Sequence, residues 1–452
     1  MKGIIRLILF VSISDAQGAD ANWDLRNYHY YNAYAIWTGR FGYDYAPAQV
    51  QTFINPFVDV PFFLLMQAIP PVCVGFILGS LHGLNAWLVF RIAVHVLRPC
   101  VVRYRELALG LAAVSMGAGA LSEVGTTFHD LTLSPLILGS LLLLIRAGYG
   151  SLLATLTAGA MVGIAVGLKY TFALYVPGLT VVVICLTAPG WWRCARALGV
   201  WGSGLCVGFA VGAGPWMLRL WVAYGTPTAQ YLNGLFRSPY FEPWSFEDHR
   251  FLPKTVLQAV AFPFYFVLSR IPVAGEARFR EARFAVLYVL IIAVVAKIVA
   301  DRLASRRSAT ASAEPVWPRL DAALIAFSVI SYVLWQKKFS IYRYLIPLEL
   351  LAPIVIYVCV SRLVASASRR AAVTVIVLAA VVLGMRAPAS SRRSWSPDVF
   401  AATVHADTVP PTSLVLVATY EPLAYVAPPF PPAARIVRIQ SNHLRPDGTT
   451  KL

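Results

Sequence analysis

The chain has 452 residues, of which 58% are hydrophobic and 13% are charged, and its mean hydropathy is +0.66. Soluble domains carry roughly a quarter charged residues, so this composition excludes a set of soluble domains and predicts one polytopic membrane domain. The formal net charge of +17 does not indicate a nucleic-acid partner. The arginines lie in short clusters between apolar tracts, as orientation signals and lipid-phosphate contacts do.

Apolar windows of about 20 residues, the length that a membrane-spanning helix needs, recur about eleven times and predict an all-α polytopic membrane protein. The predicted spans are residues 3–18, 72–97, 106–122, 131–147, 151–168, 171–188, 197–216, 283–301, 320–336, 345–361 and 371–387. The stretches 56–70 and 256–272 are broken by prolines, which predicts interfacial or re-entrant segments. The start of the chain also fits a signal peptide, but we favour a retained first span, cut short at its start.

Six cysteines lie inside apolar tracts or beside basic clusters and lack the spacing of a disulfide framework or a zinc site. We expect them to pack as small hydrophobic side chains. They are Cys73, Cys100, Cys185, Cys194, Cys206 and Cys359.

Four arginine clusters fall on one side of the membrane if the spans alternate, and the positive-inside preference makes that side the cytoplasm. They contain Arg98, Arg103, Arg105, Arg193, Arg196, Arg302, Arg306, Arg307, Arg319, Arg362, Arg369 and Arg370. In a bacterial inner membrane, the N-terminus is then cytoplasmic and the C-terminus extracytoplasmic.

The predicted membrane module covers residues 1–387, and residues 388–452 form a small extracytoplasmic α/β appendage. Apolar runs at 413–418 and 434–439, separated by a proline-rich turn, predict two strands in this appendage.

The first outer loop, residues 19–55, contains Asp24 followed by Asn27, Tyr28 and His29. A carboxylate at the membrane surface can act as a general base if it is desolvated, and aromatic side chains would be costly on a purely solvated loop. Asp24 is therefore a catalytic candidate, with the next three residues as substrate ligands. The alternative is that Asp24 only caps a helix that starts near Leu25.

The second outer loop, residues 122–130, ends in His129 and Asp130 between two strongly apolar spans. Ionisable groups are costly at such positions and usually face a polar cavity. Asp130 is thus a second catalytic candidate, able to bind sugar or a cation, although it could also cap the next span. Lys169 lies between two apolar tracts, so it either snorkels to the interface or pairs with a phosphate or carboxylate.

The third outer segment, residues 217–282, combines aromatic residues with Arg237, Asp248 and Arg250. This mixture suits sugar stacking and hydroxyl recognition, but it is also typical of an amphipathic interfacial segment. Further along, Arg343 and Tyr344 open the tenth span. A positive charge on the outer side opposes the positive-inside preference, which favours Arg343 as a phosphate ligand beside Tyr344.

The segments 23–29 (WDLRNYH) and 343–349 (RYLIPLE) resemble those of multi-pass bacterial proteins of the GT-C superfamily, integral-membrane glycosyltransferases that use polyprenyl-phosphate sugars. The resemblance covers residues 1 to about 390. It implies that Asp24 is the first-loop catalytic acid, Asp130 the second-loop acid and Arg343 a donor-phosphate ligand. Two adjacent acids are common in the first loop of well-studied members, whereas this chain has Asp24 alone. The resemblance therefore does not decide whether the protein binds a divalent cation.

Together these features predict an inverting glycosyltransferase that moves a hexosyl or pentosyl unit from a polyprenyl-phosphate donor to a glycan, lipid or protein acceptor. Arg343 and Lys169 would neutralise the donor phosphate while Asp24 deprotonates the acceptor. A transporter or lipid flippase is the main alternative and would need polar groups near the bilayer midplane. A third hypothesis is a non-catalytic assembly partner that acts through the proline-rich tail.

Overall fold

The computed structural model describes most of the chain. The described residues are 14–98, 101, 103–148, 150–187, 189–243, 248–268, 273–275, 277–307, 319–389, 391–400, 403 and 405–442.

Seven described helices are long and apolar enough to cross a membrane, which confirms the prediction of an all-α polytopic membrane protein. They are α4 (Pro71–Leu97), α7 (His129–Ala147), α10 (Trp191–Tyr224), α13 (Arg283–Arg307), α14 (Arg319–Lys338), α15 (Ile346–Leu363) and α16 (Ala367–Gly384). Three shorter apolar helices accompany them: α8 (Leu152–Leu168), α9 (Tyr175–Leu186) and α12 (Val256–Leu268). The first predicted span lies mostly in residues 1–13, outside the described residues.

The predicted span 106–122 is interrupted, because two helices occupy this stretch: α5 (Tyr104–Ala113) and α6 (Ala118–Glu123). Carboxylates from distant segments accept the first backbone N–H groups of α6. Ala118 donates to Glu281 at 3.0 Å, and Ala120 donates to Glu349 at 2.9 Å. A helix N-terminus has unpaired donors and a partial positive charge, so these acids stabilise a new helix start there.

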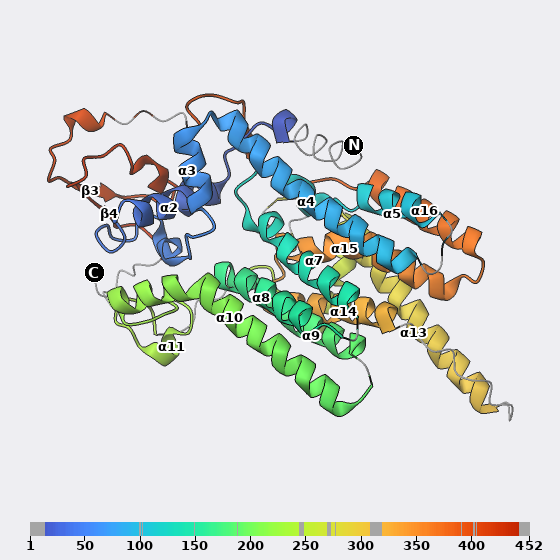
Figure 1. Ribbon diagram of the computed structural model, residues 1–452. Helices are drawn as coiled ribbons and strands as arrows, with labels where there is room; N and C mark the ends of the chain where they lie inside the picture. Colours follow the sequence, from blue (N-terminus) through green and yellow to red (C-terminus); the bar gives the residue numbers. More distant parts are fainter. Residues whose placement is uncertain are drawn as a thin grey trace.

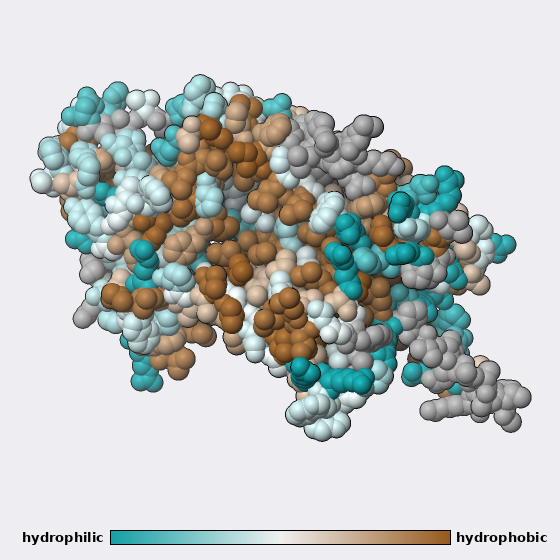
Figure 2. Space-filling view, in the orientation of Figure 1, coloured by the Kyte–Doolittle hydropathy of each residue, from teal (hydrophilic) through white to brown (hydrophobic). Residues whose placement is uncertain are grey.

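Helix α15 is the centre of the bundle, with 89% of its apolar window buried, whereas α13 and α16 bury only 22% and 17% of theirs. Exposed apolar side chains on the outer helices suit contact with lipid chains. Figure 2 shows such side chains gathered over the middle of the molecule, between more hydrophilic ends.

The proline-broken stretches each form one short helix: α3 (Val60–Ala68), which has 9 residues, and α12, which has 13. Both are shorter than the ~20 residues that a span needs. In Figure 1, α3 lies with α2 (Tyr30–Trp37) and the C-terminal strands at the left-hand end of the bundle.

The two predicted C-terminal strands are present as β3 (Leu414–Val417) and β4 (Arg435–Arg438), which pair in parallel. Their sheet is built against the first outer loop, because Tyr45 bridges Val437 in the β4 strand. A second two-stranded sheet joins β1 (Ala19–Asp20) to β2 (Arg392–Arg393). The C-terminal segment therefore packs on residues 19–55 through two sheets.

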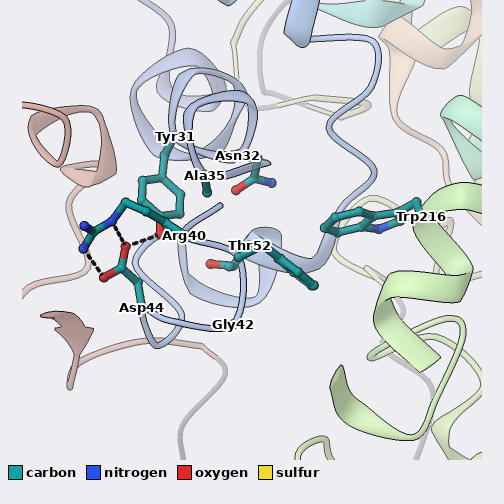
Figure 3. A pocket seen from close by; sticks show the side chains of 9 residues that line it. Tyr31, Asn32, Ala35, Arg40, Gly42, Asp44, Thr52 and Trp216 are labelled. Atoms are coloured by element: carbon teal, nitrogen blue, oxygen red, sulfur yellow. Dashed lines mark hydrogen bonds and ion pairs between the residues drawn. The ribbon is translucent and has the colours of Figure 1, made fainter. Parts of the chain in front are cut away.

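A buried ion pair secures this contact beside a small cavity in the first loop (Figure 3). Asp44 accepts hydrogen bonds from Nε of Arg40 at 2.7 Å and from the Tyr31 hydroxyl at 2.7 Å. Its other oxygen accepts from the Ile436 backbone N–H at 2.9 Å, while Arg40 donates to the Ala434 carbonyl at 2.6 Å. Asp44 and Arg40 thus tie the first loop to β4.

Candidate active site

The first-loop candidate Asp24 precedes a single π-helical turn, η1 (Leu25–His29). Its side chain makes no helix-capping hydrogen bond, so the capping role considered from the sequence is not what this carboxylate does. Its Oδ2 accepts a hydrogen bond from Nη1 of Arg343 at 2.8 Å. Single π-turns occur frequently at functional sites.

Arg343 lies in the short helical turn η4 (Tyr342–Leu345) that leads into α15. Besides Asp24, its guanidinium approaches Asp130, with Nε 3.9 Å from Oδ2. The guanidinium also lies 4.8 Å from the Phe128 ring centroid and 5.5 Å from that of Tyr344. Aromatic faces at these distances attract a cation and restrict the orientation of the guanidinium.

Lys169 occupies the break between α8 and the next helical turn, and its Nζ lies 2.6 Å from Oδ1 of Asp130. It also lies 5.1 Å from the Tyr344 ring centroid. Of the two alternatives predicted for this lysine, the structure shows pairing with a carboxylate. Asp24, Asp130, Arg343 and Lys169, from four separate segments, therefore form one cluster.

The cluster is open on its cationic side. The Arg343 side chain is 31% exposed and that of Lys169 18%, whereas the Asp130 side chain beneath them is 1% exposed. At 3.9 Å, Nε of Arg343 and Oδ2 of Asp130 are too far apart for a hydrogen bond. Neither atom has a hydrogen-bond partner among the described residues. Unpaired buried polar atoms need a specific explanation, and a ligand that binds between these two groups is one.

Two carboxyl groups of the site have opposite electrostatic settings. Burial raises the pKa of Asp24, but the Arg343 guanidinium and His29 outweigh burial and hold this pKa below its ordinary value. Glu123, which ends α6 outside the candidate spans, has its pKa raised well above the ordinary value by burial and by the charge of Asp130. Asp24 is therefore an ionised carboxylate near neutral pH, whereas Glu123 holds its proton to a higher pH than an ordinary glutamate does.

A second polar group adjoins this cluster and contains His29, Asp59 and His129. Oδ1 of Asp59 lies 2.8 Å from Nδ1 of His29 and 2.7 Å from Nε2 of His129. Burial raises the pKa of Asp59, but the two imidazoles outweigh burial and lower it. The three ligand-type atoms lie within 4.8 Å of one another, which is close enough to hold a metal ion.

The other predicted substrate ligands of the first loop divide into two cases. Tyr28 joins the two polar groups: its ring lies 4.2 Å from that of His29, and burial together with Asp24 raises the pKa of its hydroxyl. Asn27 is fully buried, and its amide donates to the carbonyl of Ala48 at 3.2 Å. Asn27 therefore holds the fold of the loop.

The structure does not bring the predicted ligands of the third outer segment to this cluster. Asp248 and Arg250 form an ion pair with each other at 2.8 Å, in which the arginine side chain is 63% exposed. Arg237 follows α11 (Asn233–Phe236) and is exposed, and no contact joins it to the cluster among the described residues. Tyr344, in contrast, is part of the site.

Sequence reasoning missed three residues of the site: Asp59, Glu123 and Phe128. Asp59 lies at the start of an apolar stretch, and Glu123 lies in a short loop between apolar tracts. Both positions are costly for an acid that lacks a polar environment. The position of each acid in the sequence therefore indicated a polar site around it. The role of Phe128 depends on the approach of Arg343, which the sequence does not reveal.

Comparison with known proteins gave no matching family model and no matching curated relative. Among solved structures, the chain is similar to the crystal structure of the Archaeoglobus fulgidus oligosaccharyltransferase tethered to an acceptor peptide that contains the NVT sequon. The sequence identity is 12% and the TM-score 0.43. The match covers 96% of this chain but 63% of the oligosaccharyltransferase chain, so this chain spans less than two thirds of that length.

Proposed function

We propose that the protein is an inverting glycosyltransferase that moves a sugar from a polyprenyl-phosphate donor to an envelope acceptor on the outer face of a bacterial inner membrane. The observation that carries this proposal is the position of Arg343. Its guanidinium bonds Asp24 at 2.8 Å, lies 3.9 Å from Asp130 and is partly exposed. Such a site has a base, a phosphate ligand and a second acid within reach of one substrate.

Arg343 and Lys169 are the groups that would take the donor phosphate. Both are cations at the open side of the cluster. The planar guanidinium can bind two phosphate oxygens at once, and the ammonium adds a point charge. A lipid-linked donor reaches the site from the bilayer, and these cations stabilise the negative charge that grows on the phosphate as its bond to the sugar breaks.

Asp24 would act as the general base, and the donor itself would activate it. Without donor, the ion pair with Arg343 lowers the pKa of Asp24, which makes this carboxylate a weak base. When a phosphate competes for the guanidinium, Asp24 loses its partner while it stays buried, and burial without a partner raises a carboxyl pKa. Donor binding thus increases the basicity of Asp24.

The chemical step is a single displacement at the anomeric carbon. The acceptor oxygen forms a bond to that carbon as the bond to the phosphate oxygen breaks, and polyprenyl phosphate leaves with the electron pair. The acceptor proton passes to Asp24, and the configuration at the anomeric carbon inverts. Asp130, fixed by Lys169 at 2.6 Å, would position the sugar. Holding both reactants in one site lowers the barrier by several kcal/mol.

The experiment incubates the purified full chain with a panel of radiolabelled polyprenyl-phosphate sugars and a membrane extract as the source of acceptor. We expect release of the lipid carrier from at least one donor, and Asp24→Asn should lower this rate by about 10²–10⁴-fold. Asp15→Asn is the matched control, because Asp15 is an exposed acid that precedes the first loop. Undiminished transfer by Asp24→Asn would remove the proposed base, and transport of an intact donor without carrier release would favour the flippase hypothesis.

A further inference from the structure

The group formed by His29, Asp59 and His129 joins three separate elements at one point. His29 ends η1, Asp59 precedes α3, and His129 begins α7. All three residues are buried, with exposed fractions of 1%, 2% and 6%. Two imidazole nitrogens and one carboxylate oxygen are the donor set of three-ligand zinc sites and of related transition-metal sites.

Hydrogen bonding alone does not satisfy this group. His129 Nε2 and Asp59 Oδ1 form a hydrogen bond at 2.7 Å. Nδ1 of His29 approaches the same oxygen at 2.8 Å, but this nitrogen has no hydrogen-bond partner among the described residues, and neither has Oδ2 of Asp59. Orphaned atoms in a fully buried polar group require a further partner. A cation coordinated by both nitrogens and the carboxylate supplies one.

The charge of the site favours a cation when both imidazoles are neutral, as they are when they bind a metal. The formally charged side chains of the two adjoining groups are Asp24, Asp59, Asp130, Lys169 and Arg343. Three acids and two bases leave one net negative charge when both histidines are neutral. A net negative site repels a phosphate. A divalent cation changes the balance to one net positive charge, which matches a phosphodiester monoanion.

We propose that His29 Nδ1, Asp59 Oδ1 and His129 Nε2 together bind one divalent transition-metal ion of the zinc class. Two donors about 2.05 Å from a tetrahedral ion lie roughly 3.3 Å apart, so the two short contacts to Asp59 open by about 0.5 Å when the ion enters. Three protein ligands are one fewer than in a closed structural site.

The ion would position the two proposed catalytic acids; this role and the charge match to a phosphate rest on the proposed function, whereas the ligand geometry does not. His129 directly precedes Asp130. Asp24 and His29 are five residues apart, which in an α-helix places them about 140° apart around the axis. The π-turn closes over one more residue per turn, which reduces this angle and brings the two positions toward the same side of the segment. Fixing His29 and His129 on one ion therefore fixes the separation of Asp24 and Asp130.

The test measures zinc on the purified full chain after chelator treatment, reloading with Zn²⁺ and removal of excess ion. We expect about one zinc per chain in the wild type, as for a specific buried site, and almost none in Asp59→Asn and His129→Gln. His95→Gln is the matched control, since His95 lies in α4, outside the group. Asp24→Asn should also keep its zinc. Ligand-field bands after loading with Co²⁺ report on the wild-type site without any variant, so a variant that fails to fold does not decide the outcome.

Two results would overturn this proposal: a reloaded wild type without zinc or cobalt bands, or folded Asp59→Asn and His129→Gln variants that retain wild-type zinc. The first result would leave a His–Asp–His hydrogen-bonded array. The site and the function fail separately. Zinc binding without sugar transfer would contradict the proposed function but support the metal site. Sugar transfer by a chain shown to hold no metal would contradict the metal site but support the proposed function.

Discussion

Nη1 of Arg343 lies 2.8 Å from Oδ2 of Asp24, across 319 positions of the sequence. This contact joins the first outer loop to the start of the most buried helix in the bundle, α15. A charged pair with a partly exposed guanidinium can exchange its carboxylate for a substrate anion at modest cost, because water and ligand reach the cation. The predictions below follow from this pair and from the contacts that support it.

Replacement of Arg343 should weaken donor binding. Arg343→Gln removes a cation that would contact phosphate directly, and loss of one partner from such a pair costs about 2–5 kcal/mol. Arg343→Lys should retain part of the affinity, because an ammonium keeps the charge but lacks the planar fork. Binding of a fluorescent polyprenyl-phosphate sugar measures both effects. Arg278→Gln, at an exposed position, is the control, and wild-type affinity in Arg343→Gln would contradict the assignment.

Glu123 should make the protein less stable as the pH rises. The raised pKa of this buried acid means that the folded protein holds a proton that the unfolded chain releases above about pH 4.5, the ordinary value. The folded state binds more protons in this window, so the free energy of unfolding falls as the pH increases above 4.5. Glu123→Gln mimics the protonated acid and should remove that part of the decline. Thermal unfolding in detergent from pH 5 to 8 measures it, and parallel curves for the two proteins would refute the prediction.

The contact between α8 and α10 depends on glycines that allow the backbones to touch. A Cβ added at Gly208 would overlap the carbonyl oxygen of Ala160, whereas one added at Gly202 meets nothing within 4 Å. Gly208→Val should destabilise the protein by at least about 3 kcal/mol, the upper end for overpacking. Gly202→Val, on the same helix, should have little effect. Unfolding midpoints in one detergent test the pair, and equal midpoints would show that the helices do not pack this closely.

Asp44→Asn should loosen the C-terminal sheet from the first loop. The change leaves Arg40 buried without its counter-charge, which typically costs about 3–5 kcal/mol, and weakens the acceptor for the Ile436 N–H. Hydrogen exchange at Ile436 and at the other residues of β4 should therefore become faster. Asp407→Asn, at an exposed position of the same C-terminal segment, is the control. Unchanged exchange in β4 would show that Asp44 does not secure the sheet.

The membrane helices and the main charged residues could be predicted from the sequence because both follow from one physical rule. Apolar tracts of span length indicate helices, and ionisable groups at the ends of such tracts must find partners. Asp24, Asp130, Lys169 and Arg343 all satisfied that rule, and the structure brings them together. Their catalytic roles stay predictions.

Other features depend on contacts between distant segments and could not be predicted from local pattern. The span predicted at 106–122 is broken because Glu281 and Glu349 accept backbone N–H groups at the start of α6. Asp59 joins the site only because the chain just after the first loop returns to His29, which lies near the start of that loop. The third outer segment around Arg237 has the mixture of aromatic and charged residues that sugar sites contain. That mixture is equally typical of an exposed interfacial segment.

The most direct test of the central claim separates donor binding from sugar transfer in Asp24→Asn. The amide cannot accept the proton, so the single-turnover rate of transfer should fall by about 10²–10⁴-fold. Donor affinity should equal or exceed that of the wild type, because phosphate no longer competes with a carboxylate for Arg343. A wild-type transfer rate in this variant, or an affinity as low as that of Arg343→Gln, would contradict the account.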